Sequence, residues 1–524
     1  MILCGEAGRL VFFFLGVQYQ DNHKERLDYF TIDCGHGHAH GHRYVNGERD
    51  GELPETILES QIEVKSIARP AKRRICRLFA RNANKYCRIW VVLLSFTVEN
   101  YKGFATRSTL SMSDAVLERR RTPPKGDSWA EHTQCVAGIF GSNASGKTTF
   151  LEALALLIRS IREAHRSPSE LHQPSRLFPE LNPQPTCYEL EAVLDDVRWR
   201  YQVAVDSAGV QEETLTRWRK SRPVKLIERA GSKGIVAGVP DLLLEKIGVN
   251  PDVLFINLAR MFKSEAVMEF VNGLARFLFI WPDEVEKIAR HTWLTNVLLG
   301  DRSWVKLAVE TLKLADLGIS GISVDEHQVP AKYIEIANAI SKILREGSEP
   351  GEAGEIGELP EEELEQIAKS IVLQHVTPAD GETVSFNLAD ESRGTIAWLN
   401  TAIPAIYGLK KGAVVVCDEL DESLHPALVR ELVEIFKNET INTKGAQLIF
   451  NTHDVTLLDR YPDSALAPHE TWFTEKNASE GCVLYQIDKG IRKESNLAKQ
   501  YFQGAFGSVP NINTADLYEV LADG

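Results

Sequence analysis

Three short runs of apolar residues stand out along this chain, at residues 135–140, 413–417 and 448–450. Runs of this length without polar alternation are typical of strands that are buried on both faces of a parallel sheet. After the first run, apolar residues recur at helical spacing, at Phe150, Leu151, Leu154, Leu157, Ile158 and Ile161. The pattern therefore predicts a buried strand followed by an amphipathic helix, and two more buried strands later in the chain.

Elsewhere apolar and polar residues alternate. They do so at 188–194 and at 199–205, with Asp195 and Asp196 between the two stretches, and this arrangement predicts a β-hairpin. Residues 93–104 are expected to form an earlier strand and a turn.

From about residue 240 to 372 the pattern becomes helical. A stretch rich in Gly and Glu at 347–357 interrupts it, and we expect a mobile loop there. Strands on both sides of a helical stretch favour an α/β fold that carries an inserted helical subdomain.

The octapeptide between the first buried strand and its helix has the form G-x-x-x-x-G-K-[ST]. It consists of Gly141, Ser142, Asn143, Ala144, Ser145, Gly146, Lys147 and Thr148, and Thr149 follows it. The glycines allow backbone conformations that a Cβ resists, so the loop N–H groups and the helix N-terminus can surround phosphate oxygens. We expect Lys147 to reach the β- and γ-phosphates of ATP and the Thr148 hydroxyl to bind Mg²⁺. A chance Gly/Ser turn is the weaker interpretation, because the full pattern lies between a strand and an amphipathic helix.

Two acids follow the strand at 413–417. Asp418 suits a carboxylate associated with Mg²⁺, and Glu419 suits the group that polarises an attacking water. His453 lies just past the strand at 448–450, where it can hydrogen-bond a γ-phosphate. Without the phosphate loop, the two acids could be ordinary surface residues and the histidine could have a structural role. The roles given to the acids and to the histidine therefore depend on the phosphate loop.

Composition narrows the class of protein. The chain has 524 residues, 44% of them hydrophobic and 25% charged, which is typical of a globular protein of two or three domains. Its formal charge of −14 argues against a generally basic nucleic-acid binder, but it does not argue against a local basic patch. The eight cysteines show no metal or disulfide spacing. The apolar run at 11–17 is short and follows Glu6. We therefore expect no signal peptide, no membrane contact and a cytoplasmic location.

Residues 1–91 differ from the rest. They hold 14 Lys and Arg residues against 11 Asp and Glu, and four of the eight cysteines. Histidines at positions 36, 38, 40 and 42 could bind a metal, and the basic run at 72–88 could bind nucleic acid. Because clear periodicity is absent, we favour an N-terminal extension that is poorly ordered or not native coding sequence.

The motifs together resemble those of the ABC-type ATPases of the RecF/SMC/OLD clan. Within it, the chain is similar to stand-alone bacterial "AAA family ATPase" proteins of anti-phage and abortive-infection loci. The likeness covers residues 92–524 in family order. The stretches that carry it, besides the phosphate loop, are 94–104, 314–322, 391–395, 418–426, 447–454 and 501–510.

The resemblance implies an ABC-type P-loop ATPase head, a mixed sheet flanked by helices. Its parts would be an N-terminal lobe at 92–239, a helical insert at 240–375 and a C-terminal lobe at 376–524. The resemblance also implies a homodimer or higher oligomer. In that assembly Ser392, Gly394 and Thr395 of one subunit would cover the γ-phosphate of ATP bound to the other.

This chain departs from transporter-type members in several places. Arg393 and Thr395 replace Gly and Gln of the usual signature, and His425 stands where those members carry Asp. The usual glutamine loop has two candidates, Gln173 and Gln184.

For the biological role, the resemblance favours the sensor or motor component of a bacterial anti-phage system that acts with a separate effector protein such as a nuclease. One alternative is an OLD-like nuclease, although only 71 residues follow His453 to hold a nuclease domain. The other is a DNA-repair scaffold related to SMC and RecF proteins, which would bind nucleic acid.

Overall fold

The computed structural model describes residues 91–163, 166–219, 222–231, 233–238, 250–315, 318–328, 367–377, 380–459, 464–486, 496–506 and 518, and the backbone of four strands near the N-terminus. The chain divides into two units, Met1–Cys87 and Arg88–Gly524. Within the described residues, no helix combines the length and the apolar character that crossing a membrane requires.

The first unit contains an antiparallel sheet in the order β1-β2-β3-β4. Its strands are β1 (Ile2–Cys4), β2 (Arg9–Phe13), β3 (Arg26–Asp33) and β4 (His38–Val45). The side chains of the histidine tract and the whole basic run at 72–88 lie outside the described residues. Our interpretation of residues 1–91 therefore stays a prediction.

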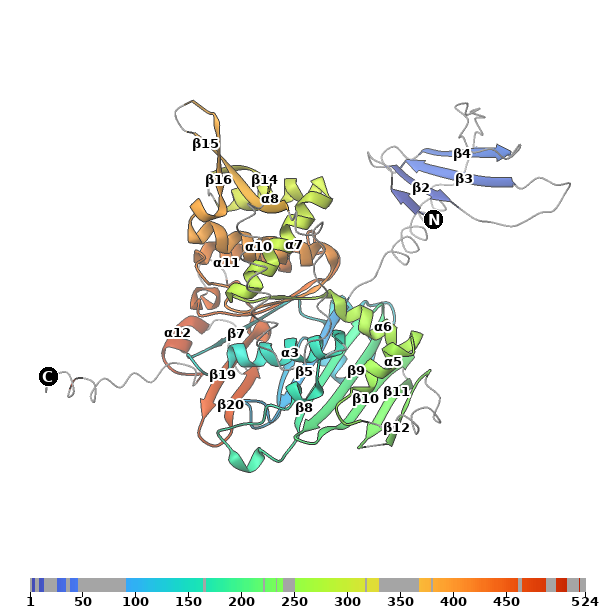
Figure 1. Cartoon of the computed structure of the whole chain (residues 1–524), viewed down its shortest axis with the longest axis vertical. Coiled ribbons are helices and arrows are strands. Elements are labelled where there is room, and N and C mark those ends of the chain that lie inside the picture. The colour runs from blue at the N-terminus through green and yellow to red at the C-terminus, as the bar shows by residue number, and fades with distance from the viewer. Residues whose placement is uncertain are drawn as a thin grey trace. The chain divides into compact units, whose positions relative to one another are not determined.

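In the second unit, one large sheet is antiparallel throughout, in the order β12-β11-β10-β9-β8-β5-β6 (Figure 1). The predicted hairpin is confirmed as β8 paired with β9. Asp195 and Asp196 form its turn with φ of 51° and 65°, the left-handed conformations that a tight type I′ turn needs. The strands are β5 (Val91–Glu99), β6 (Ser108–Ser111), β8 (Thr186–Leu194), β9 (Val197–Asp206), β10 (Gly209–Arg219), β11 (Arg222–Ala230) and β12 (Lys233–Val236).

The three predicted apolar strands lie side by side in a second, mixed sheet of order β13-β17-β18-β7-β19-β20. Its first five strands run parallel and only β20 is antiparallel, so the carboxyl ends of β7, β17 and β18 meet at one edge. The strands are β7 (Val136–Gly141), β13 (Phe277–Ile280), β17 (Val414–Cys417), β18 (Gln447–Asn451), β19 (Thr471–Asn477) and β20 (Gly481–Gln486). A mixed α/β fold is thereby confirmed.

Helix α3 (Lys147–Arg162) lies between the two sheets and contacts β5 of one and β7 of the other. Its predicted apolar face is buried, and the Phe150 ring meets Phe96 and Phe104 edge-on. Burial of this face fixes the helix, and its N-terminus then lies at the carboxyl edge of the mixed sheet. The shorter helices near the large sheet are α2 (Ala115–Arg119), α5 (Phe255–Met261) and α6 (Glu265–Gly273).

A second hydrophobic cluster joins the mixed sheet to a helical layer. Its helices are α7 (Glu284–Gly300), α8 (Arg302–Leu314), α10 (Arg393–Lys411), α11 (Pro426–Lys437) and α12 (Leu497–Phe502). An antiparallel sheet of β14 (Ile319–Gln328), β15 (Ile367–Val376) and β16 (Thr383–Asn387) adjoins this layer.

The prediction that residues 240–375 are helical needs correction. Helices α5 to α8 lie there, but so do strands β13, β14 and β15. Strand β13 is an apolar run of four residues that pairs with β17, and periodicity cannot separate so short a buried strand from a helix. The predicted loop at 347–357 lies outside the described residues.

Candidate nucleotide-binding site

The phosphate loop takes a shape that its two glycines make possible. Gly146 begins the helix with φ of 105°, and Ala144 is also left-handed, with φ of 60°. A Cβ on Gly141 would lie 2.5 Å from the Thr474 carbonyl oxygen, so no larger residue fits. The Ser145 hydroxyl donates to the Ser142 carbonyl at 2.8 Å and lies 2.6 Å from Thr474 Oγ1. Neighbouring strand β19 therefore helps to hold the loop.

Lys147 is the first residue of α3 and is only 6% exposed. Its ammonium donates to the carbonyl oxygens of Gly141 at 2.9 Å and Ser142 at 3.0 Å, so it lies inside the loop. Burial lowers the pKa of Lys147, and the nearby carboxylates of Glu419, Asp418 and Asp421 oppose that shift. The predicted acids therefore lie close enough to the phosphate loop to act on the Lys147 charge.

The side-chain amide of Asn451 joins the three motifs at the end of β18. Its Oδ1 accepts a hydrogen bond from the Glu419 backbone N–H at 2.5 Å, and its Nδ2 donates to Thr148 Oγ1 at 3.3 Å and to Asp418 Oδ1. The sequence pointed to this residue only as part of the strand motif, without a role. The signal available in the sequence was its position directly after the apolar run at 448–450.

Asp418 is 5% exposed and suits a metal-binding role. Burial raises the pKa of its carboxyl to about 6, and hydrogen bonds with Thr148 and Asn451 oppose that rise. A buried carboxylate beside a hydroxyl is an oxygen donor pair of the kind that Mg²⁺ prefers, with phosphates and water completing its shell. The described residues contain no cluster of three or more His, Cys, Asp or Glu suited to a metal, so the protein alone offers few ligands.

Glu419 follows Asp418 but its side chain is exposed. Its backbone is left-handed, with φ of 50°, a conformation that costs a non-glycine residue about 1–3 kcal/mol. The hydrogen bond from its N–H to Asn451 holds this turn. The turn directs the carboxylate away from the sheet and toward solvent, where it can meet a water molecule.

Asp421 holds the segment that carries His453. Its Oδ1 accepts from the Thr452 hydroxyl at 2.7 Å, and both carboxylate oxygens lie 3.2 Å from the His453 backbone nitrogen. Burial and the nearby Lys147 cation lower the pKa of the His453 imidazole, while Asp421 and Glu419 oppose the shift. This shift favours the neutral imidazole when no nucleotide is bound. Sequence reasoning gave Asp421 no role, since nothing in its local pattern shows this contact.

The signature segment forms the N-terminus of α10. Ser392 caps the helix, because its Oγ accepts from the Thr395 N–H at 3.1 Å. Ser392 is exposed, whereas Thr395 is only 3% exposed and its hydroxyl lies 2.9 Å from Ser392 Oγ. A Cβ on Gly394 would come within 3.6 Å of the Ser423 carbonyl oxygen. Ser392 is thus accessible to a second molecule and the Thr395 side chain is not.

The two glutamine-loop candidates lie beside β8. The Gln173 side chain donates to the Glu170 carbonyl at 2.9 Å, and the Gln184 carbonyl accepts from the Asn100 amide at 3.0 Å. The Gln173 side chain therefore bonds to its own loop, and only the backbone of Gln184 takes part in the second contact. The glutamine-loop residue stays unassigned.

Comparison with known proteins bears on this site. Residues 136–259 and 323–459 match the family model described as "AAA domain, putative AbiEii toxin, Type IV TA system". The first matched segment contains the phosphate loop, and the second contains Asp418, Glu419 and His453. No curated protein matches the chain.

Several solved structures match the chain at low sequence identity and low TM-score. An Smc head bound to the C-winged helix domain of ScpA shares 13% identity with a TM-score of 0.32, over 76% of this chain and 98% of that one. An Smc head with an extended coiled coil, bound to the C-terminal domain of ScpA from Pyrococcus furiosus, shares 12% with a TM-score of 0.34, over 79% and 98%. The recombination mediator protein RecF shares 10% with a TM-score of 0.31, over 76% and 99%.

The matched segments coincide with the residues that the structure gathers at the carboxyl edge of the mixed sheet. A phosphate loop at the start of α3, two acids after β17 and a histidine after β18 occur in the expected order. Over these segments the chain is similar to the AAA-domain family that the model describes.

Proposed function

We propose that the chain binds ATP with Mg²⁺ at the phosphate loop and hydrolyses it to ADP and phosphate. The observation that carries the proposal is the Asn451 amide, which bonds to Thr148 of the loop and to both acids after β17. Thr148 and the two acids are more than 250 residues apart in the sequence, and Asn451 brings them together beside the phosphate loop, where they would face the γ-phosphate of a bound ATP. A purely structural set of acids would not need to face a phosphate loop.

Each residue has a role in this proposal. The loop N–H groups and the Lys147 ammonium hold the phosphates, and Thr148 with Asp418 would hold Mg²⁺, which when bound neutralises charge on the phosphate oxygens. The Glu419 carboxylate accepts the proton of the attacking water. The neutral His453 ring donates a hydrogen bond to the γ-phosphate. Positioning and charge neutralisation supply most of the catalysis in phosphoryl transfer.

We further propose that hydrolysis takes place in a homodimer. The support is the exposed Ser392 at the N-terminus of α10, a helix of 19 residues whose first N–H groups can face a phosphate. Ser392 and Gly394 of one subunit would then complete the site of the other. Thr395 contributes its backbone rather than its buried side chain.

Binding is tested by isothermal titration calorimetry with a non-hydrolysable ATP analogue and Mg²⁺. Lys147→Ala removes the cation that faces the β- and γ-phosphates, so the analogue should bind at least tenfold more weakly, while the melting temperature stays near that of the parent. Lys102→Ala is a matched control, since Lys102 is exposed and paired with Glu152. Equal affinity in the parent and the Lys147 variant would contradict the proposal.

For the biological role, we propose a component of a bacterial anti-phage system that works with a separate effector. The support is the resemblance to defence-associated ATPases, together with the family description, which names a putative toxin of a toxin–antitoxin system. Bacteria that carry the gene with its neighbours should resist phage infection, and Lys147→Ala should abolish that resistance. If the Lys147→Ala bacteria still resist phage, the defence role does not depend on ATP binding at the phosphate loop.

A further inference from the structure

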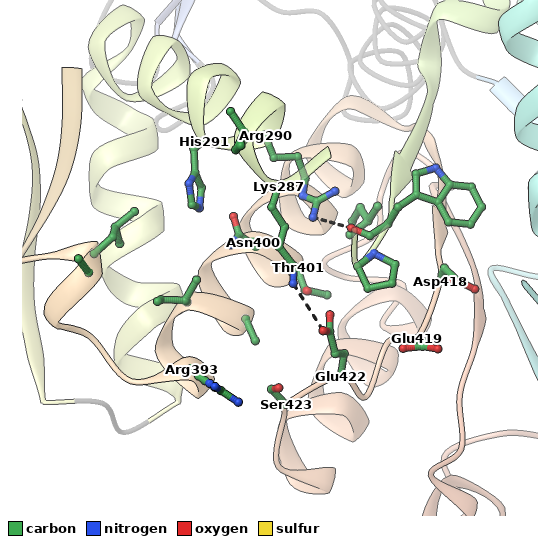
Figure 2. Close-up of a pocket in the computed structure, with 18 residues that line it drawn as sticks. Lys287, Arg290, His291, Arg393, Asn400, Thr401, Asp418, Glu419, Glu422 and Ser423 are labelled. Atoms are coloured by element: carbon green, nitrogen blue, oxygen red, sulfur yellow. Dashed lines mark hydrogen bonds and ion pairs between the residues drawn. The ribbon is translucent and has the colours of Figure 1, made fainter. Parts of the chain in front are cut away.

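A cavity of about 560 Å³ opens beside the two acids, between α7, α10 and the loops that follow β13 and β17 (Figure 2). A volume of this size suits a small organic ligand. Its lining includes Trp281, Lys287, Arg290, Asn400, Asp418 and Glu419. The phosphate loop contributes none of the lining residues, but Asp418 and Glu419 belong to the lining, so the cavity adjoins the proposed hydrolysis site.

Asn400 presents an unsatisfied amide to this cavity. It is only 3% exposed, and within the described residues neither its Oδ1 nor its Nδ2 has a hydrogen-bond partner. Burying such a group without a partner destabilises the fold. Asn442 shows the usual arrangement: its Nδ2 donates to two carbonyls and its Oδ1 accepts from the Ala446 N–H. The amide of Asn400 thus lacks the partners that Asn442 has, and a ligand with both a donor and an acceptor would supply them.

Arg290 lies on the facing helix α7, and two of its donor atoms also lack hydrogen-bond partners in the described residues. It is 9% exposed, and its Nη2 donates to the Trp281 carbonyl at 2.6 Å. Its Nε and Nη1 have no hydrogen-bond partner in the described part of the chain, where no ion pair to it is found either. Arg229, by contrast, uses Nε, Nη1 and Nη2 on three backbone carbonyls. A buried guanidinium with free donors calls for an anion.

Asp283, Glu286 and Glu422 act on Arg290 electrostatically, but Glu286 bonds to Arg159 rather than to Arg290. Glu422 is paired with Lys287 at 3.5 Å, and Asp418 bonds to Asn451 on the side of the phosphate loop. Arg393 at the start of α10 adds a second cation to the lining. The apolar wall includes Ile280, Trp281, Ile288, Leu388 and Ile396, which suits a flat organic ring.

We propose that this cavity is a second ligand site, for a nucleoside monophosphate. The phosphate would bind Arg290, the donor–acceptor edge of the base would pair with the Asn400 amide, and the ring would lie on the apolar wall. Asparagine pairs with a nucleobase edge through adjacent donor and acceptor atoms, and arginine is well suited to phosphate. The ligand would also lie near Glu419. If our proposed function is right, its binding should therefore change the rate of ATP hydrolysis.

The binding test first fills the phosphate loop with Mg²⁺ and a non-hydrolysable ATP analogue. AMP, GMP, CMP, UMP and inorganic phosphate are then titrated separately by calorimetry. We expect at least one monophosphate to bind once per chain, more tightly than inorganic phosphate, and Asn400→Leu and Arg290→Met each to weaken it at least tenfold. Absence of binding, affinity equal to that of inorganic phosphate, or affinity unchanged in both variants would overturn the proposal. This test does not depend on hydrolysis.

Stability measurements separate a ligand-binding amide from a structural one. Asn400→Leu removes two unsatisfied atoms, so the ligand-free variant should melt at the parent temperature or above it. Asn442→Leu, the matched control, breaks three hydrogen bonds and should melt several degrees lower. An Asn400→Leu protein that loses as much stability as Asn442→Leu would show that the amide serves the fold, and would also overturn the proposal.

Discussion

At the scale of single residues, the site depends on one neutral amide. Asn451 bonds to Thr148, to the Asp418 carboxylate and to the Glu419 backbone, so it positions two acids with different tasks. Such a group need not touch the substrate to matter. Residues that orient metal-binding or catalytic side chains commonly affect activity by about 10- to 100-fold.

Asn451→Ala should therefore reduce ATP hydrolysis by about 10- to 100-fold while ATP affinity changes little. Asn438→Ala is the control, because Asn438 is an exposed cap at the end of α11. A steady-state assay measures both variants. Asn451→Ala protein with parental kcat would show that the amide bridge is not needed.

The same substitution should shift the pH dependence. Burial raises the pKa of the Asp418 carboxyl to about 6, and the hydrogen bond from Asn451 opposes the rise. Mg²⁺ binding needs the ionised carboxylate, so activity of the parent should fall as the pH drops through about 6. Loss of the opposing bond raises the pKa further, and the acid limb of the kcat/KM profile should move to higher pH in Asn451→Ala. A limb that stays in place or moves to lower pH would contradict this assignment.

At the scale of elements, strand β10 holds helix α5 through one buried carboxylate. Glu213 is fully buried and accepts from the Phe255 and Ile256 N–H groups at 2.6 and 2.9 Å, and from the Tyr201 hydroxyl at 3.0 Å. Burial raises the pKa of Glu213, and these hydrogen bonds oppose the shift. The positive end of the helix thus has its counter-charge on a neighbouring strand.

Glu213→Ala should lower the free energy of unfolding by about 3 kcal/mol or more, because three buried donors lose their acceptor. Glu213→Gln keeps a hydrogen-bond acceptor and should lose less. Urea unfolding measures both, with the exposed neighbour Glu212→Ala as control. If Glu213→Ala and Glu212→Ala unfold at the same urea concentration, the clamp between β10 and α5 does not contribute to stability.

Elements with a local signal could be predicted from the sequence. The strands β7, β17 and β18 are apolar runs, the β8–β9 hairpin alternates around two Asp residues, and α3 carries a clear apolar face. Strand β13 was mistaken for part of a helical region, since four apolar residues show no period. The Asn451 and Asp421 contacts were missed because they depend on which strands become neighbours, and spacing along the chain does not encode that.

At the scale of the whole molecule, the chain divides into two compact units, and the recognisable motifs all lie in Arg88–Gly524. We predict that a protein beginning at Arg88 folds and hydrolyses ATP at nearly the full-length rate. The cut precedes β5, which starts at Val91 and pairs with β8, so it removes no strand of the large sheet. Melting and ATPase assays check this. An insoluble or inactive truncated protein would show that residues 1–87 belong to the functional unit.

The proposed dimer can be tested by mixing two damaged proteins. Ser392→Arg should block approach of α10 to the facing γ-phosphate, whereas Lys147→Ala damages phosphate binding. Each variant alone should be inactive, but a mixed dimer would keep one intact site, with Lys147 from one chain and Ser392 from the other. Partial recovery of ATPase activity is expected. Full activity of the Ser392→Arg protein alone would contradict a site shared between subunits.

The most direct test of the central claim compares ATP binding with ATP hydrolysis in the Glu419→Gln protein. The phosphate loop, Lys147 and Asp418 stay intact, so the non-hydrolysable analogue should bind as it does to the parent. Loss of the group that accepts the water proton should slow single-turnover hydrolysis by about 10²- to 10⁴-fold, while Glu431→Gln, an exposed acid on α11, keeps the parental rate. A Glu419→Gln protein that hydrolyses ATP at the parental rate would contradict the account.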